Sequence, residues 1–151
     1  MSAETSRASV VAAPVAAVWA LLADFGSLAR WVPEVDHSCR LHAGPVGVGT
    51  VRRVQVGRTT LLETVTSWSP PSRLSYDITG LPPALRHVAN DWRLEAVDHG
   101  TEVTVTTTVD AGPRPPQRLV ARLVARRMAA TSDQMLAGLA AALTSGDPAR
   151  A

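Results

Sequence analysis

The sequence predicts an α+β domain in which an antiparallel sheet of about seven strands packs against one long C-terminal helix. Six short runs of strand-forming residues follow one another between residues 35 and 109, and clusters of Gly, Pro, Asp and Ser separate them. A helical pattern of apolar residues then extends from residue 117 to about residue 143. Because strands that adjoin in sequence usually pair, an antiparallel meander is the simplest arrangement.

The N-terminal segment is expected to form one strand and two short helices. Residues 7–12 fit a strand, and Pro14 suits the first turn of a helix because its φ is already helical. Apolar residues follow at helical spacing before Gly26: Val15, Val18, Trp19, Leu22 and Phe25. A second helical stretch, residues 27–31, ends before Pro33, because the residue before a proline avoids helical angles.

Turn-forming and helix-breaking residues also predict where the central strands and the long helix begin and end. The six strands are expected over residues 35–42, 50–56, 59–68, 74–79, 87–97 and 102–109. The helix is expected to end before Gly146 and Pro148, because both residue types break helices. Its predicted buried stripe comprises Val120, Leu123, Val124, Met128, Thr131, Met135, Leu139 and Leu143.

Alternation along three strands predicts which side chains face the core, because successive residues of a strand point to opposite faces of the sheet. The inward sets are Leu74, Tyr76 and Ile78; Val88, Asn90, Trp92 and Leu94; and Val103, Val105, Thr107 and Val109. Asn90 would then lie beside Trp92 and offer a hydrogen bond to a ligand oxygen. The alternative for Asn90 is a core amide that water satisfies.

The hairpin at Gly57 sets the register of its two strands. Glycine at the first turn position favours a two-residue type II′ connection. Pairing across this turn places Arg52 opposite Glu63. The next pair toward the turn is Val54 and Leu61. This face is the more apolar one, so we expect it inside, where two charges are tolerated because they are partners.

The composition is that of a soluble globular protein with one domain. The chain has 151 residues, of which 46% are hydrophobic and 19% are charged. We therefore expect a single domain over residues 1–151 with an ordered core at about 7–144. The sequence has no apolar run long enough to span a bilayer and no signal-like N-terminus, and its single Cys39 excludes an internal disulfide. These features predict a cytoplasmic location.

The basic residues indicate compositional bias rather than a nucleic-acid partner. The formal net charge is +2, and all fifteen basic residues are arginine, as in proteins from GC-rich bacterial genomes. Nucleic-acid binding normally needs a concentrated basic patch with stacking aromatic residues, so we expect none. Arg118, Arg122 and Arg126 recur at four-residue spacing. They form either a solvated helix face or a docking site for an acidic acyl carrier protein or a lipid headgroup.

Several short segments, each occurring once, follow one another along the chain at particular spacings. They are Ala13-Pro14-Val15-Ala16-Ala17-Val18-Trp19, Asp24-Phe25, Trp31-Val32-Pro33, Val48-Gly49-Thr50-Val51-Arg52, Glu63, residues 70–76 and Gly100-Thr101-Glu102-Val103. In this order and spacing they resemble the START/polyketide-cyclase superfamily (SRPBCC), whose members have the helix-grip fold. The similarity covers nearly all of residues 7–143.

The resemblance implies a curved antiparallel sheet that grips the C-terminal helix around a deep internal cavity. Members of the superfamily bind lipids, sterols, polyketides, plant hormones or quinones, and some are aromatase/cyclases that act on carrier-bound poly-β-ketones. The recurrent Arg and Glu of the superfamily fall on Arg52 and Glu63. Aromatase-type members also use a pocket tyrosine near the second strand, where this chain has Val35; its only tyrosine is Tyr76.

Arg52 and Glu63 are the candidate catalytic residues. Arg52 would stabilise developing oxyanion charge, and Glu63 would act as a base or hold a water molecule. The alternative is a structural ion pair. The candidate ligand-binding residues are Trp31, Val54, Leu61, Tyr76, Asn90, Trp92, Val105, Met128, Thr131 and Met135. Aromatic residues and methionines at such positions are more often ordinary core.

The expected function is the binding of a hydrophobic small molecule by a polyketide cyclase/dehydrase-like protein. Its substrate would be a poly-β-ketone chain that cyclises or loses water. The alternatives are a non-catalytic carrier or sensor of a lipid or quinone, and an interaction protein with a solid core. The histidines lack metal-ligand spacing, and the sequence has no dinucleotide or phosphate-loop fingerprint, so we expect neither metal nor cofactor. The oligomeric state is open between monomer and dimer.

Overall fold

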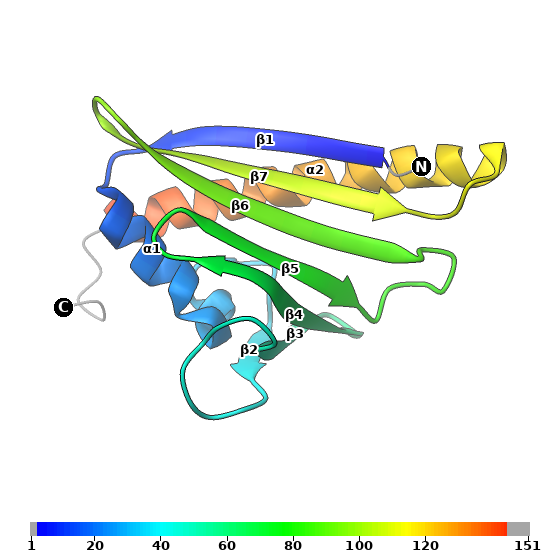
Figure 1. The fold of residues 1–151 in the computed structure, drawn as a ribbon, viewed down its shortest axis with the longest axis horizontal. Helices are drawn as coiled ribbons and strands as arrows, with labels where there is room; N and C mark the ends of the chain where they lie inside the picture. The colour runs from blue at the N-terminus through cyan, green and yellow to red at the C-terminus, as the bar shows by residue number, and fades with distance from the viewer. Residues whose placement is uncertain (1–2, 145–151) are drawn as a thin grey trace.

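The computed structural model describes residues 3–144 and shows a seven-stranded antiparallel sheet with helices packed against its inner face (Figure 1). The strands are β1 (Ala3–Val11), β2 (His37–Arg40), β3 (Val51–Val56), β4 (Thr59–Ser69), β5 (Arg73–Thr79), β6 (His87–Val97) and β7 (Gly100–Asp110). The helices are α1 (Val15–Ala23), the 3₁₀ helix η1 (Phe25–Arg30) and α2 (Pro115–Thr144). The predicted fold class and element order are confirmed. Gly146 and Pro148 lie outside the described residues.

The sheet is a meander whose free edge is extended by the first strand. Strands β2 to β7 pair in chain order, and β1 lies beside β7. The β1 strand begins at Ala3 rather than Arg7, because Ala3 pairs with Val109 and backbone pairing continues where side chains carry no strand signal. The β2 strand is shorter than expected, because the Val35 amide donates to the Val32 carbonyl in a turn.

The β3–β4 hairpin has the predicted register. Val56 pairs with Thr59, and Arg52 lies opposite Glu63. Gly57 has a φ of 59°, and no other residue type among residues 3–144 has a positive φ. A left-handed conformation at the first turn position alone fits a type II′ turn, which is why glycine is needed there.

The inward faces of β5, β6 and β7 are also as predicted. All eleven side chains assigned to the core on these strands are buried: Leu74, Tyr76, Ile78, Val88, Asn90, Trp92, Leu94, Val103, Val105, Thr107 and Val109. Three helices share the task of covering this face. Helix α2 packs against β1 and β7, α1 against β6 and β7, and η1 against β2 and β3 (Figure 1). The long helix α2 was expected to cover this face, but it covers only part of it, and α1 and η1 cover the rest.

The buried stripe of α2 differs from the predicted one. Small residues at helical spacing, Ala121, Ala125, Ala129 and Ser132, face the sheet ahead of Met135, Leu136 and Leu139. Val120, Leu123 and Thr131 are exposed, so their predicted inward placement is wrong. The physical reason is distance: small side chains let the helix lie close to β1 and β7, and the larger apolar residues then lie on other faces.

Candidate functional site

A buried ion pair joins the neighbouring strands β3 and β4. Arg52 is 3% exposed and Glu63 is 5% exposed. The Nε and Nη2 atoms of Arg52 each lie 2.7 Å from Oε1 of Glu63. No described residue donates a hydrogen bond to Oε2, and 7% of the Glu63 side chain remains exposed. One carboxylate oxygen is thus engaged by the arginine, and the other is free to accept a proton or a hydrogen bond.

Helix η1 fixes the arginine from the opposite side. The Nη1 atom of Arg52 donates to the Phe25 carbonyl at 3.0 Å. The guanidinium carbon also lies 3.9 Å from the centre of the Phe25 ring and 4.8 Å from the centre of the Tyr76 ring. Cation–π contact strengthens when water is excluded. The positive charge of Arg52 is therefore held by a carboxylate, a carbonyl and two aromatic faces.

A second polar cluster continues along β5, β6 and β7. The Tyr76 hydroxyl accepts hydrogen bonds from Asn90 Nδ2 and Trp92 Nε1, each at 3.2 Å. Asn90 Oδ1 accepts a 2.7 Å hydrogen bond from Thr107. All four side chains are buried. Protein groups therefore engage both ends of the Asn90 amide, and its contact with a ligand stays a prediction.

The Tyr76 phenol is held in its neutral form. Burial raises its pKa above the ordinary value of 10.0, and the nearby Glu63 carboxylate raises it further. Arg52 and the hydrogen bonds from Trp92 and Asn90 lower the pKa but do not outweigh burial. Since the phenol oxygen already accepts two hydrogen bonds and no described residue accepts its proton, that proton is available for donation.

Most of the predicted ligand-binding residues are buried or half-buried in the core of the protein. Those that are buried are Trp31, Val54, Tyr76, Asn90, Trp92, Val105 and Met135, whereas Leu61 and Met128 are half-buried. Trp31 packs edge-on against Trp92, with ring centres 6.0 Å apart. Thr131 lies on the exposed side of α2, so it does not face the interior with the others.

Phe25 and Thr107 complete the cluster, although the sequence did not single them out as site residues. Strand alternation had placed Thr107 inward beside Asn90, and this was the available signal. Phe25 followed the apolar spacing of the first helix, but nothing in that spacing indicates that its carbonyl would receive Arg52. A backbone acceptor of this kind depends on the path of the chain and not on residue type.

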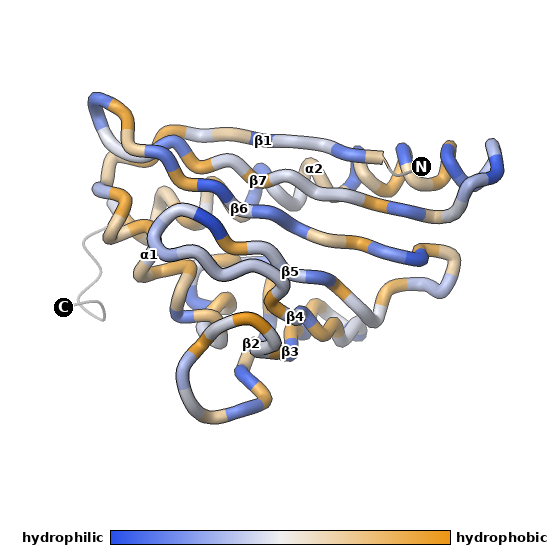
Figure 2. The backbone as a smooth tube through the Cα atoms, in the orientation of Figure 1, coloured by the Kyte–Doolittle hydropathy of each residue, from blue (hydrophilic) through white to orange (hydrophobic). Residues whose placement is uncertain are grey.

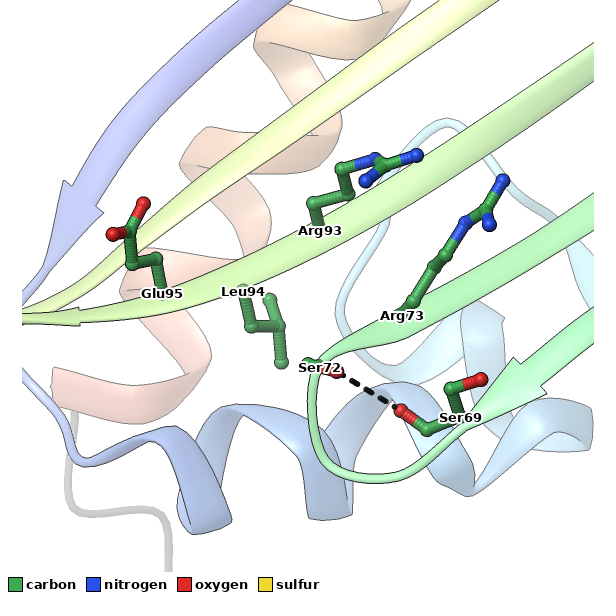
Figure 3. Close-up of a pocket in the computed structure, with 6 residues that line it drawn as sticks. All are labelled: Ser69, Ser72, Arg73, Arg93, Leu94 and Glu95. Atoms are coloured by element: carbon green, nitrogen blue, oxygen red, sulfur yellow. Dashed lines mark hydrogen bonds between the residues drawn. The ribbon is translucent and has the colours of Figure 1, made fainter.

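Two surface pockets lie away from the buried cluster. One, of about 430 Å³, is lined by Ser69, Ser72, Arg73, Arg93, Leu94 and Glu95 (Figure 3). Both of its arginines are engaged by Asp91, because Arg73 donates to Oδ1 and Arg93 to Oδ2. The other, of about 280 Å³, lies between β1 and α2. Neither contains a predicted site residue, so the internal cavity stays a prediction.

Comparison with known proteins assigns the chain to a family. A model described as "Polyketide cyclase / dehydrase and lipid transport" matches residues 2–144. The chain belongs to this family. The predicted START/polyketide-cyclase superfamily is thereby confirmed. Membership and fold support a protein that binds a hydrophobic ligand. No curated protein matches the chain.

Solved structures of several proteins share the fold. Ara h 8.0201 has a TM-score of 0.75 at 18% identity, covering 96% of this chain and 99% of that chain. A protein from Nitrosospira multiformis has a TM-score of 0.75 at 22% identity, with coverage of 95% and 98%. The Zhui aromatase/cyclase from a Streptomyces species has a TM-score of 0.70 at 22% identity, with coverage of 93% and 95%. At these identities the likeness establishes the helix-grip fold.

The structure was also searched for membrane-spanning helices and for groups of metal-binding side chains. None of the helices within residues 3–144 is both long and apolar enough to cross a bilayer. The same residues bring together no group of three or more His, Cys, Asp or Glu side chains that could hold a metal ion.

Proposed function

We propose that the protein binds a hydrophobic molecule carrying carbonyl groups at the inner face of its sheet and promotes its cyclisation or dehydration. The observation that carries this proposal is the adjacency of Arg52, Glu63 and Tyr76 in an apolar, water-poor setting. A poly-β-ketone chain matches this setting, because it is apolar overall and reacts through carbonyl oxygens and the acidic carbons between them. The proposed location is the cytoplasm.

Each polar group has a distinct part in the proposed reaction. The Tyr76 proton, which no described residue accepts, would be donated to a substrate carbonyl oxygen. Arg52 would stabilise negative charge as it develops there. Glu63 Oε2 would accept the proton from the carbon next to the carbonyl. The apolar walls would hold the chain in a folded, reactive conformation.

Turnover of a synthetic poly-β-ketone thioester tests this proposal. The wild-type protein should convert it to cyclised or dehydrated products, and Glu63→Gln should slow conversion by about a hundredfold or more, because a positioned base is lost. Glu95→Gln is the matched control, since Glu95 is an exposed carboxylate on β6. Binding without conversion by the wild type would instead support a carrier or sensor. An unchanged rate in Glu63→Gln would contradict the assigned role.

A further inference from the structure

The N-terminal half of α2 presents an apolar face that no described element covers. Leu119 is 58% exposed, Leu123 is 57% exposed and Val120 is 42% exposed. Leu119 and Leu123 are four residues apart, so they lie on one face of the helix. That face is opposite Ala121 and Ala125, which pack toward the sheet. Exposed leucines of this kind, adjacent on a helix, are unusual unless the surface has a partner.

Arginines surround the exposed leucines. Residues 114–127 contain five of them, Arg114, Arg118, Arg122, Arg126 and Arg127, and residues 111–132 contain no Asp or Glu. Without these five charges the formal net charge of the chain would fall from +2 to −3. Glu4 lines the same small pocket as Arg122 and Arg126. The positive charge of the protein is therefore concentrated on this helix, while the remainder of the chain is acidic.

We propose that this α2 surface, made of Leu119, Val120, Leu123, Arg122, Arg126 and Arg127, docks on the anionic face of a phospholipid bilayer. The leucines would enter the boundary between headgroups and acyl chains. The arginines would extend their apolar stems alongside and place their guanidinium groups among lipid phosphates. This inference goes beyond the proposed function, because docking needs neither a bound ligand nor turnover.

The shape and charge of the surface favour a bilayer over other partners. The N-terminal end of α2 extends past the ends of β1 and β7 (Figure 1), and apolar and polar residues alternate along it (Figure 2). A flat surface can therefore reach this end of the helix. A second copy of the chain would bring the arginines of both copies together, which costs free energy. An acidic protein would also match the charge, and the experiment distinguishes it.

Vesicle flotation tests the proposal. The protein should float with vesicles of phosphatidylcholine containing about one third phosphatidylglycerol, should not float with pure phosphatidylcholine, and should be released by high salt. Leu119→Ser/Leu123→Ser and Arg122→Glu/Arg126→Glu should each weaken binding by about tenfold or more. The controls are Val10→Ser/Val48→Ser and Arg30→Glu/Arg58→Glu, which alter exposed residues elsewhere and should stay within about twofold of the wild type.

A fluorescent label on the helix tests the orientation. Cys39 is the single cysteine, so Cys39→Ser/Leu123→Cys provides one labelling site. An environment-sensitive fluorophore at position 123 should shift to shorter wavelength with anionic vesicles only. The proposal is overturned by absence of flotation, by equal losses in the control variants, or by an unshifted label. Binding to an acidic carrier protein without any vesicle binding would also overturn it and assign the surface to a protein.

Discussion

Arg52 and Glu63 face each other across the β3–β4 ladder, and two guanidinium nitrogens lie 2.7 Å from the same carboxylate oxygen. Both side chains are buried, so water screens the two charges only weakly. Such a pair contributes little compared with two apolar residues, but removal of one member leaves the other charge without a partner in the interior.

Single substitutions of this pair should therefore be costly, and the double substitution should not. We expect Arg52→Met or Glu63→Leu to lower the free energy of unfolding by about 3–5 kcal/mol. Arg52→Met/Glu63→Leu should recover most of that loss, because no buried charge remains. Urea denaturation at neutral pH measures all three. A double variant that is less stable than either single variant would contradict this explanation.

The phenol of Tyr76 should ionise only as the protein unfolds. Burial places its folded pKa above the ordinary value of 10.0. Its contribution to stability is thus complete below pH 10 and is lost as the pH rises toward the folded pKa. Tyr76 is the only tyrosine, so tyrosinate absorbance reports this group alone. We expect that absorbance to rise together with the loss of circular dichroism. Ionisation near pH 10 in a folded protein would show that the phenol is accessible.

Asp91 on the outer face should make stability fall in acid. Burial alone would raise its pKa, but hydrogen bonds from Ser75, Arg73 and Arg93 outweigh burial and hold the pKa below the ordinary value of 3.8. The stability from this cluster is present above that value and is lost as the pH falls through the folded pKa. Asp91→Asn should therefore lower the melting temperature at neutral pH but not in strong acid. An equal deficit at both pH values would contradict the linkage.

Gly138 should tolerate no side chain. A Cβ at this position would lie 2.0 Å from the Trp31 carbonyl oxygen, so α2 would have to move away from the segment that carries Trp31. We expect Gly138→Ala to lower the free energy of unfolding by about 1–3 kcal/mol, despite the better helix propensity of alanine. Gly47→Ala is the control, because a Cβ there meets no atom within 4 Å. Equal stability of the two variants, measured by thermal unfolding, would show that the helix has room.

The sequence was most informative where a local rule determines the structure. Glycine at position 57 sets the β3–β4 register, and that register alone brings Arg52 to Glu63. Strand alternation likewise placed Asn90 and Trp92 on the inner face. Long-range contacts carry no such local signal. The Phe25 carbonyl receives Arg52 only because η1 folds over β3, and no residue type indicates that approach.

In the long helix α2, hydrophobicity alone predicted the wrong set of buried residues. The large residues Val120 and Leu123 have the spacing of a buried stripe, as do Ala121 and Ala125, which share the same period. Burial energy favours the larger side chains. The close approach of α2 to β1 and β7 favours the smaller ones, and in the folded chain this packing requirement prevails.

The most direct test of the account is the identification of whatever molecule the purified protein carries. Native mass spectrometry should show a species heavier than the 15.9 kDa chain, and solvent extraction should release an apolar compound with carbonyl or hydroxyl groups. Adding that compound back should raise the melting temperature, because it binds only the folded protein. A bare chain that neither carries a guest nor takes up any apolar probe would contradict the claim that its inner face receives a hydrophobic ligand.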